Sequence, residues 1–299
     1  MLIIKTMVHE TIWGGDRLAP YADIESNKIG HLYSLISNGE MESEILNGEY
    51  KGQLFRKYFD ENKERLNLGH YKELPFLLAL VDATADLSLQ VHPNDEVAKE
   101  LEGADFGKNE SWYFLEIPET GKIYDGCKAK TSQELREKVA EGKYDDVINY
   151  LSVEKGSYVY IQAGTMHAMA AGSLVYEIEE NCNATYRVYD FDRVDADGNK
   201  RPLQTEAALK SIDVTKKSVA QRYDEEKVER LYSTKLLENA TVYTNNSKTL
   251  EALTVIEGTS QIDGYKVQKG STIVLEPGET VILNPSDFIV ARPLLKEEM

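Results

Sequence analysis

Residues 87–95 read LSLQVHPND, and this stretch has the alternation of a short β-strand that ends in a histidine. Side chains two positions apart point to the same face of a strand, so Gln90 and His92 project together while the apolar residues beside them face the other way. Pro93 lacks a backbone N–H, and we expect the strand to end there. Two interpretations fit this polar face: a hydrogen-bonded histidine in a half-buried sheet, or half of a metal site.

Two further residues of metal-ligand type lie at the ends of β-rich runs. Glu110 begins ESWYFLEI, and His167 follows a glycine turn in YIQAGTMHAM. Together with His92 and the amide oxygen of Gln90, they would form a mixed nitrogen and oxygen set that suits Zn²⁺ and other divalent first-row metals. Each residue alone also has an ordinary interpretation, a solvated carboxylate or a structural imidazole. Lys108 is an ordinary surface lysine unless Glu110 binds metal, in which case its ammonium must lie near the site.

A second group of charged residues lies in the segment 177–193, EIEENCNATYRVYDFDR. Alternation places Glu177 and Glu179 on one face of their strand. Arg187 is surrounded by tyrosines and valine, and a buried guanidinium needs an anionic partner. That partner is either one of the aspartates that follow it in the segment, which would make the arginine structural, or an anion at a functional site.

Composition restricts the class of partner. The 299 residues carry a net charge of −17, which disfavours nucleic acid and anionic membrane surfaces. The opening residues MLIIKTMVHETIWGG lack the apolar core of a signal peptide, and no apolar run approaches membrane-spanning length, so we expect a cytoplasmic protein. Two cysteines, Cys127 and Cys182, do not indicate a disulfide framework. Cys182 is more typical of a small buried apolar residue than of a ligand or nucleophile.

Short β-runs dominate the first two thirds of the chain and predict a mainly β fold. Five runs are rich in valine, isoleucine, tyrosine or phenylalanine: LSLQVH, SWYFLEI, SYVYIQ, LVYEIE and TYRVYDF. Several are apolar or aromatic on both faces, which favours enclosure in a barrel or sandwich. Helical spacing or capping residues predict helices within 51–66 and 131–151 and a third helix after Pro202.

Changes in composition predict two domains. Residues 1–213 carry the candidate metal ligands, with a helical insertion near 127–151. The charged stretch 214–234 has little strand character and is predicted to be a linker. Residues 235–299 contain short β-runs and glycine turns but no histidine, which predicts a smaller β module without metal ligands.

Four motifs in the chain resemble those of the type I mannose-6-phosphate isomerases in their short bacterial form. They are PFLLALVDATADLSLQVHPND, GKNESWYFLE, YIQAGTMHAM and YEIEENCNATYRVYDFDR, in the same order and spacing. IWGGDRL and the β-rich tail resemble the same family, so the likeness covers nearly the whole chain. The resemblance implies a cupin-type β-barrel (jelly roll), one Zn²⁺ per chain, and a phosphorylated hexose as substrate. The reaction implied is the interconversion of mannose 6-phosphate and fructose 6-phosphate through an enediolate.

The resemblance also implies roles for individual residues. The implied zinc ligands are Gln90, His92, Glu110 and His167. Arg187 corresponds to the catalytic arginine of the family, Lys108 to a substrate-binding lysine, and Glu177 to an acidic residue that is our candidate base.

Three positions depart from the family pattern. His31 replaces a glutamate, Ala79 replaces a lysine and Gln204 replaces a histidine. Two alternatives therefore stay open. The first is a catalytically weakened paralogue that binds a sugar phosphate. The second is a cupin iron oxygenase, because two histidines and one carboxylate also form the facial triad of those enzymes. The sequence does not indicate an oligomeric state.

Overall fold

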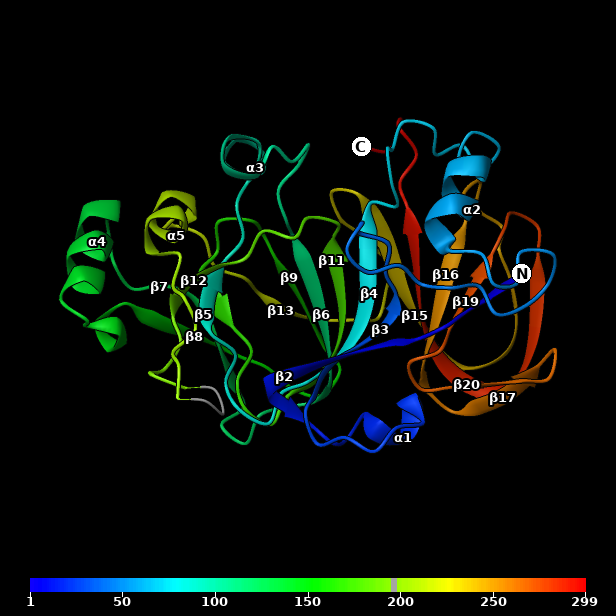
Figure 1. Ribbon diagram of the computed structural model, residues 1–299, viewed down its shortest axis with the longest axis horizontal. Coiled ribbons are helices and arrows are strands. Elements are labelled where there is room, and N and C mark those ends of the chain that lie inside the picture. Colours follow the sequence, from blue (N-terminus) through cyan, green and yellow to red (C-terminus); the bar gives the residue numbers. More distant parts are fainter. Residues whose placement is uncertain (195–197) are drawn as a thin grey trace. The chain divides into compact units, whose positions relative to one another are not determined.

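The computed structural model describes residues 1–194 and 198–299, which fold mainly into antiparallel β-sheets (Figure 1). The chain divides into two compact units that are discontinuous in sequence. The first, called here the central unit, comprises Glu10–Asp16 and Val81–Arg222. The second, called here the terminal unit, comprises Met1–His9, Arg17–Leu80 and Tyr223–Met299. Throughout the described residues the sheets are open and not closed barrels.

Two sets of hydrogen-bonded strands build the central unit. One sheet has the strand order β12-β5-β10-β7-β8, and another contains the neighbours β13-β9-β6-β11. The strand bounds are β5 Leu89–Val91, β6 Glu110–Glu116, β7 Lys122–Cys127, β8 Ile148–Ser152, β9 Ser157–Ile161, β10 His167–Ala168, β11 Leu174–Glu180, β12 Tyr186–Tyr189 and β13 Ala220–Arg222. The five β-runs expected from the sequence are β5, β6, β9, β11 and β12, so the mainly β prediction is confirmed.

Helices of the central unit lie in the connections between strands. Their bounds are α3 Asp95–Glu102, α4 Ser132–Ala140, the 3₁₀ turn η1 Tyr144–Asp146 and α5 Thr205–Ser211. Thr131 caps α4, because its hydroxyl accepts a hydrogen bond from the Glu134 N–H at 3.1 Å. The predicted insertion at 127–151 thus contains a helix, but its last residues belong to β8, which pairs with β7. The helical part of the insertion is therefore shorter than predicted.

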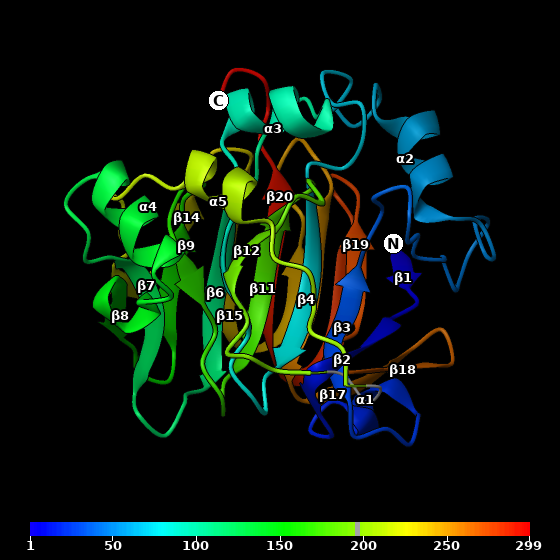
Figure 2. The ribbon, with the colours of Figure 1, turned by 60° about the vertical axis from the view of Figure 1, so that its left-hand side comes forward.

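The first sheet of the central unit separates an apolar face from a polar one. Leu89 and Val91 of β5 are buried in a cluster with Val188 of β12, Leu135 of α4 and Leu209 of α5. Figure 2 shows α4 and α5 close to β7, β8 and β12. Because alternate side chains point to opposite faces of a strand, burial of this apolar face directs the intervening polar side chains to the other face.

The terminal unit is built on a six-stranded sheet of order β1-β19-β16-β20-β15-β14. A separate hairpin, β17-β18, lies between β16 and β19 in the sequence. Its strand bounds are β1 Leu2–Ile4, β3 Ile29–Leu35, β14 Lys227–Val228, β15 Tyr232–Thr244, β16 Glu251–Glu257, β17 Thr259–Ile262, β18 Tyr265–Gln268, β19 Thr272–Leu275 and β20 Thr280–Pro293. Its helices are α1 Ala19–Ala22 and α2 Phe55–Asn62. The strands β2 Met7–Gly15 and β4 Phe76–Asp82 contribute residues to both units.

Pairing between distant parts of the chain explains why the units are discontinuous. β1 pairs with β19, with Ile3 opposite Ile273. The first residues of the chain therefore complete the sheet of the last residues.

The stretch 214–234, predicted as a linker, contains β13 and β14 and the start of β15. The placement of domain boundaries at residues 213 and 235 stays a prediction. Among the described residues, no helix is both long and apolar enough to span a membrane.

Candidate metal centre

Three buried side chains from separate strands of the central unit converge on one point. His92 follows the last residue of β5, Glu110 begins β6 and His167 begins β10. The Nε2 atom of His92 lies 3.0 Å from Glu110 Oε2, and the Nε2 atom of His167 lies 3.2 Å from Glu110 Oε1. All three side chains are at most 2% exposed. The three residues that the sequence suggested as ligands are thus brought together, and their ligand atoms lie within 4.8 Å of one another.

The hydrogen bonds of the two imidazoles leave their inner nitrogens available to a metal. Nδ1 of His92 lies 3.0 Å from the carbonyl oxygen of Ala184, and Nδ1 of His167 lies 2.9 Å from that of Thr165. A carbonyl oxygen only accepts, so each Nδ1 carries the hydrogen and a neutral ring has its lone pair on Nε2. Neither Nε2 atom has a hydrogen-bond partner in the described part of the chain. Metal-binding histidines have this tautomer when a backbone carbonyl accepts a hydrogen bond from their other ring nitrogen.

The spacing of the donor atoms also fits a metal. Zinc–nitrogen and zinc–oxygen bonds of about 2.0–2.2 Å place two ligands of a tetrahedral ion roughly 3.3 Å apart. The nitrogen–oxygen distances of 3.0 and 3.2 Å are close to that value. Without an ion or a shared proton, the carboxylate of Glu110 would face two nitrogen lone pairs inside the protein. The donor set therefore fits a divalent cation.

The surrounding charges and burial favour the protonation states that bind metal in two of the three residues, a neutral His92 and an ionised Glu110. Burial, together with the ammonium of Lys108, lowers the pKa of His92 and keeps this imidazole neutral. Burial favours the protonated acid of Glu110, but the two imidazoles outweigh it and hold the pKa of Glu110 well below its usual range. Burial opposes a charge on His167, yet the Glu110 carboxylate outweighs that effect and raises the pKa of His167. A metal at His167 would therefore compete with a proton for its Nε2 atom.

Gln90 lies on the same face of its sheet as His167. In the strand register it stands opposite His167 of β10 on one side and opposite Arg187 of β12 on the other. Directly opposite residues in antiparallel strands share a face. The amide oxygen of Gln90 accepts a hydrogen bond from the Ser88 hydroxyl at 3.2 Å. The role of Gln90 as a fourth ligand stays a prediction.

Acidic residues of β11 continue from the candidate metal centre. Glu179 stands opposite Glu110, and Glu177 stands opposite Trp112, so the predicted common face of the two β11 glutamates is confirmed. The Lys108 ammonium lies 2.6 Å from Glu179 Oε2 and 4.0 Å from Glu110 Oε2. Lys108 is buried, so it is not a surface lysine.

The pKa values of Glu177 and Glu179 are shifted in opposite directions. Burial, followed by the carboxylates of Glu179 and Glu110, raises the pKa of Glu177 well above its usual value. Burial acts in the same direction on Glu179, but the ammonium of Lys108 outweighs it and lowers the pKa. The Trp112 indole donates a 2.7 Å hydrogen bond to Glu177 Oε1 and fixes that carboxyl group. A carboxyl group with a raised pKa beside an ionised one suits proton transfer.

Arg187 does not form the structural aspartate pair that its segment allowed. The carboxylate of Asp190 binds Arg193 and Arg201, and that of Asp192 binds Lys200. The Nε atom of Arg187 is buried and has no hydrogen-bond partner within residues 1–194 and 198–299. Its guanidinium is therefore available for an anionic ligand.

Sequence reasoning missed one residue near the site, Asp125, and one contact of Gln204, a residue that it had already singled out. Asp125 of β7 stands opposite His167, is 2% exposed and accepts a hydrogen bond from the Ser218 N–H at 2.7 Å. Its signal was an acidic residue inside the β-run KIYDGC. Gln204 accepts a 3.1 Å hydrogen bond from the Arg187 N–H through its side chain, and its own N–H donates to the Arg187 carbonyl at 3.1 Å. Nothing in the sequence around Gln204 indicated that it would bind the backbone of Arg187.

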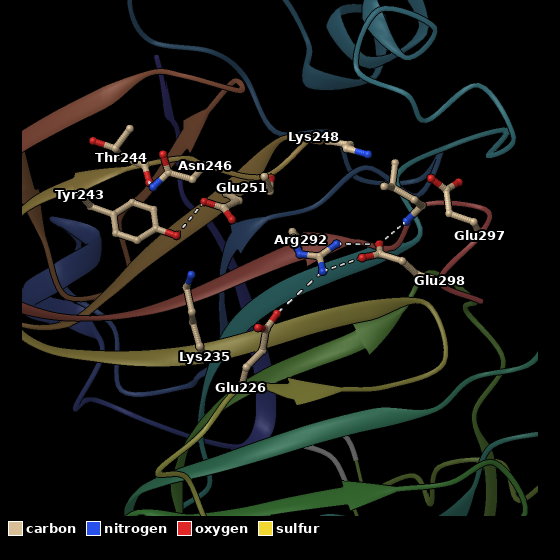
Figure 3. A pocket seen from close by; sticks show the side chains of 12 residues that line it. Glu226, Lys235, Tyr243, Thr244, Asn246, Lys248, Glu251, Arg292, Glu297 and Glu298 are labelled. Atoms are coloured by element: carbon tan, nitrogen blue, oxygen red, sulfur yellow. Dashed lines mark hydrogen bonds and ion pairs between the residues drawn. The ribbon is translucent and has the colours of Figure 1, made fainter.

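The terminal unit has a separate hollow of about 520 Å³, shown in Figure 3. Some of the polar groups that line it bind one another. Arg292 binds Glu298 through two hydrogen bonds of 2.8 and 3.0 Å and lies 3.8 Å from Glu226, while the Tyr243 hydroxyl donates to Glu251 at 2.7 Å. None of the predicted site residues lines this hollow.

Comparisons with known proteins agree with the fold and the motifs. Residues 1–113 match the model of the phosphomannose isomerase type I catalytic domain. The chain is 34% identical over 242 residues to the mannose-6-phosphate isomerase ManA of Bacillus subtilis, covering 80% of this chain and 76% of that protein. It is 35% identical over 217 residues to the mannose-6-phosphate isomerase of Streptococcus mutans, covering 72% of this chain and 68% of that protein.

Solved structures give the same result for the fold. The crystal structure of the mannose 6-phosphate isomerase from Bacillus subtilis matches with a TM-score of 0.85 and 26% identity, over 97% of this chain and 99% of that chain. A putative mannosephosphate isomerase from Archaeoglobus fulgidus matches with a TM-score of 0.79 and 17% identity, over 98% of both chains, which supports the fold alone. The expected mainly β, cupin-type fold is confirmed. The chain belongs to the type I phosphomannose isomerase family.

Proposed function

We propose that this chain is a zinc-dependent aldose–ketose isomerase that interconverts mannose 6-phosphate and fructose 6-phosphate. The observation that carries the proposal is the pair of buried imidazoles whose Nδ1 atoms donate to carbonyls and whose Nε2 atoms face Glu110. The relatives named mannose-6-phosphate isomerase support the reaction and the substrate. A cytoplasmic location stays a prediction of the same account.

The proposed zinc ligands are His92, His167 and Glu110, with Gln90 as the fourth. Nitrogen and oxygen donors of this kind suit Zn²⁺, although they also bind other first-row metals. Bound zinc would supply a Lewis acid that polarises the oxygens at C1 and C2 of the sugar.

The remaining chemistry is assigned to residues of β6, β11 and β12. Isomerisation moves a proton between C1 and C2 and passes through an enediolate, so the site needs a base that can return the proton. Glu177 is the candidate base, since its raised pKa brings the carboxyl closer to the working pH. Lys108 and Arg187 are the two cations that can stabilise developing oxyanion charge. Lys108 lies within 4.0 Å of the proposed ligand Glu110.

A second candidate function is a sugar-phosphate-binding paralogue with little catalysis. It is favoured by Ala79, which is completely buried and has no charge where the family pattern has lysine. Gln204, which also departs from the pattern, still contacts the backbone of Arg187. The departures therefore change parts of the polar surroundings and leave the metal set complete.

A coupled assay for mannose 6-phosphate isomerisation separates these candidates. We expect activity that is lost on chelation and restored by zinc. Binding of the sugar phosphate without turnover by the zinc-loaded chain, and also by its Ala79→Lys variant, would favour the paralogue. Stoichiometric iron with oxygen consumption would instead indicate the iron oxygenase.

A further inference from the structure

The terminal unit contains the hollow of about 520 Å³ that Figure 3 shows, lined by residues of β15, β16, β20 and neighbouring segments. Sites for small molecules commonly enclose about 300–1,000 Å³, so the hollow has room for a ligand. It shares no residue with the candidate metal centre, and nothing in the proposed isomerisation uses it. Any ligand of the hollow is therefore selected by the chemistry of its own lining.

This lining is polar and almost balanced in charge. Apart from Leu295 and the ring of Tyr243, the described residues that line the hollow have charged, hydroxyl or amide side chains. The charged ones are four glutamates, two lysines and one arginine. An apolar ligand would leave these groups without partners, and a highly charged ligand would be repelled by one of the two sets. The lining therefore favours a ligand that is polar but uncharged.

One side of the hollow is held together by ion pairs within the protein. Arg292 donates to both carboxylate oxygens of Glu298, at 2.8 and 3.0 Å, and lies 3.8 Å from Glu226. The Leu295 N–H donates a further hydrogen bond to Glu298 at 2.7 Å. Paired with two carboxylates, Arg292 is a structural part of the wall and not a cation that is available to a ligand.

The side formed by β15 and β16 differs, because a carboxylate and an ammonium lie there without forming an ion pair. Glu251 is 3% exposed, and among the described residues its carboxylate has one hydrogen-bond partner, the Tyr243 hydroxyl, which donates to Oε2 at 2.7 Å. The Lys235 ammonium lies 5.2 Å from the centre of the Tyr243 ring and has no carboxylate partner among the same residues. Figure 3 shows Glu251 and Lys235 on either side of the Tyr243 hydroxyl.

The Glu251 carboxyl gains from a further partner. Burial raises its pKa, and the Tyr243 hydrogen bond and the charge of Lys235 reduce this effect without cancelling it. Its second oxygen, Oε1, makes no hydrogen bond within residues 1–194 and 198–299. A donor from a ligand would compensate part of the cost of burying this carboxylate.

A carboxylate and a nearby ammonium that form no ion pair match a ligand with neighbouring hydroxyl groups. One hydroxyl can donate to the carboxylate of Glu251 while the next accepts from the ammonium of Lys235. Hydrogen bonds with one ionised partner are roughly twice as strong as neutral ones. Neighbouring hydroxyl groups on an uncharged molecule are the defining feature of carbohydrates, so the lining and this pair favour the same class of ligand.

We propose that the hollow is a second ligand site, for a neutral mono- or disaccharide, in which Glu251 accepts a hydrogen bond from one sugar hydroxyl and Lys235 donates to its neighbour. Tyr243 is a positioning residue, because its hydroxyl fixes the Glu251 carboxyl and its ring lies under Lys235. The site does not depend on the proposed isomerase activity, since it uses none of the residues assigned to that reaction.

The test is a titration of the zinc-loaded full chain with mannose, glucose, mannobiose and cellobiose, followed by saturation-transfer NMR. We expect at least one of these sugars to bind. Its Kd should rise roughly 10- to 100-fold in Glu251→Gln and in Lys235→Met, because each change removes one charge-assisted hydrogen bond. The matched controls are Glu238→Gln and Lys266→Met, at exposed positions of β15 and β18 outside the hollow, and they should keep the wild-type Kd.

A second measurement needs no variant and covers the case in which a substitution prevents folding. In the wild-type chain, the bound sugar should shift the backbone amide NMR signals of Tyr243 and Glu251. Shifts confined to residues outside the hollow would overturn the site.

The remaining outcomes separate this site from the proposed isomerase. Binding of none of the four sugars, or an unchanged Kd in folded Glu251→Gln and Lys235→Met, would overturn the proposal. Binding of inorganic phosphate or free glycine in place of every sugar would also overturn it. Sugar binding that depends on Glu251, in a chain that does not isomerise mannose 6-phosphate, would support the site and contradict the proposed function.

Discussion

Replacement of Glu110 by glutamine should remove most of the stability that zinc gives to the protein. Glu110 contributes an oxygen to each histidine contact, at 3.0 and 3.2 Å, and is the negatively charged member of the proposed ligand set. An amide of the same shape keeps the packing but weakens the metal bond. Loss of an outer-shell partner of a metal ligand already costs about 10- to 100-fold in affinity, so loss of the carboxylate itself should cost at least the upper value.

The expected magnitude follows from linkage between binding and folding. Free zinc at 1,000 times the wild-type Kd stabilises the folded chain by about 4.1 kcal/mol. A variant with an affinity reduced about 100-fold is then only at roughly 10 times its Kd, which corresponds to about 1.4 kcal/mol. For a chain of this size, about 2 °C per kcal/mol gives a zinc-induced rise of roughly 8 °C for wild type and at most about 3 °C for Glu110→Gln.

Scanning calorimetry of metal-stripped protein, with and without zinc, measures both values. The control is Glu116→Gln, at the exposed end of the same strand, which should keep the full wild-type rise. Elemental analysis should find about one zinc per chain in wild type and in this control. An equal zinc-induced rise in wild type and Glu110→Gln would refute the argument, because it would place the metal elsewhere.

Three further outcomes are expected. Arg187→Lys should lower kcat/KM on the order of 100-fold without loss of zinc, since lysine keeps the charge but not the fork; steady-state kinetics and elemental analysis check this. Trp112→Phe removes the hydrogen-bond donor to Glu177 and should raise the already elevated pKa of that carboxyl further. The acid limb of the dependence of kcat/KM on pH should therefore move to higher pH. Zinc affinity should fall as pH drops through the raised pKa of His167, because protons compete for its Nε2; zinc titrations at several pH values would show no such fall if His167 is not a ligand.

The local part of the fold could be predicted because it is determined by local periodicity. The alternation around Gln90 and His92 and the capping residue of α4 each lie within one element, and each agrees with the structure. The discontinuous units could not be predicted in this way. They depend on the pairing of β1 with β19, and nothing in the sequence of either strand specifies a partner about 270 residues away.

The candidate site shows the same difference between local and long-range information. His92, Glu110 and His167 were suggested by residue type at strand ends, and the structure brings them together. Asp125 was missed because its place opposite His167 follows from strand register, which no single β-run determines. The availability of the Arg187 guanidinium was also not predictable, because it requires knowing which of the nearby arginines bind Asp190.

The most direct test of the central claim is a zinc titration of metal-stripped protein during isomerisation of mannose 6-phosphate to fructose 6-phosphate. The account predicts no turnover without metal, a linear rise in rate with added zinc, and a plateau at one equivalent per chain. Turnover that is unchanged in protein containing less than about a tenth of an equivalent of transition metal would contradict it. Absence of isomerisation in protein with one bound zinc would contradict it equally.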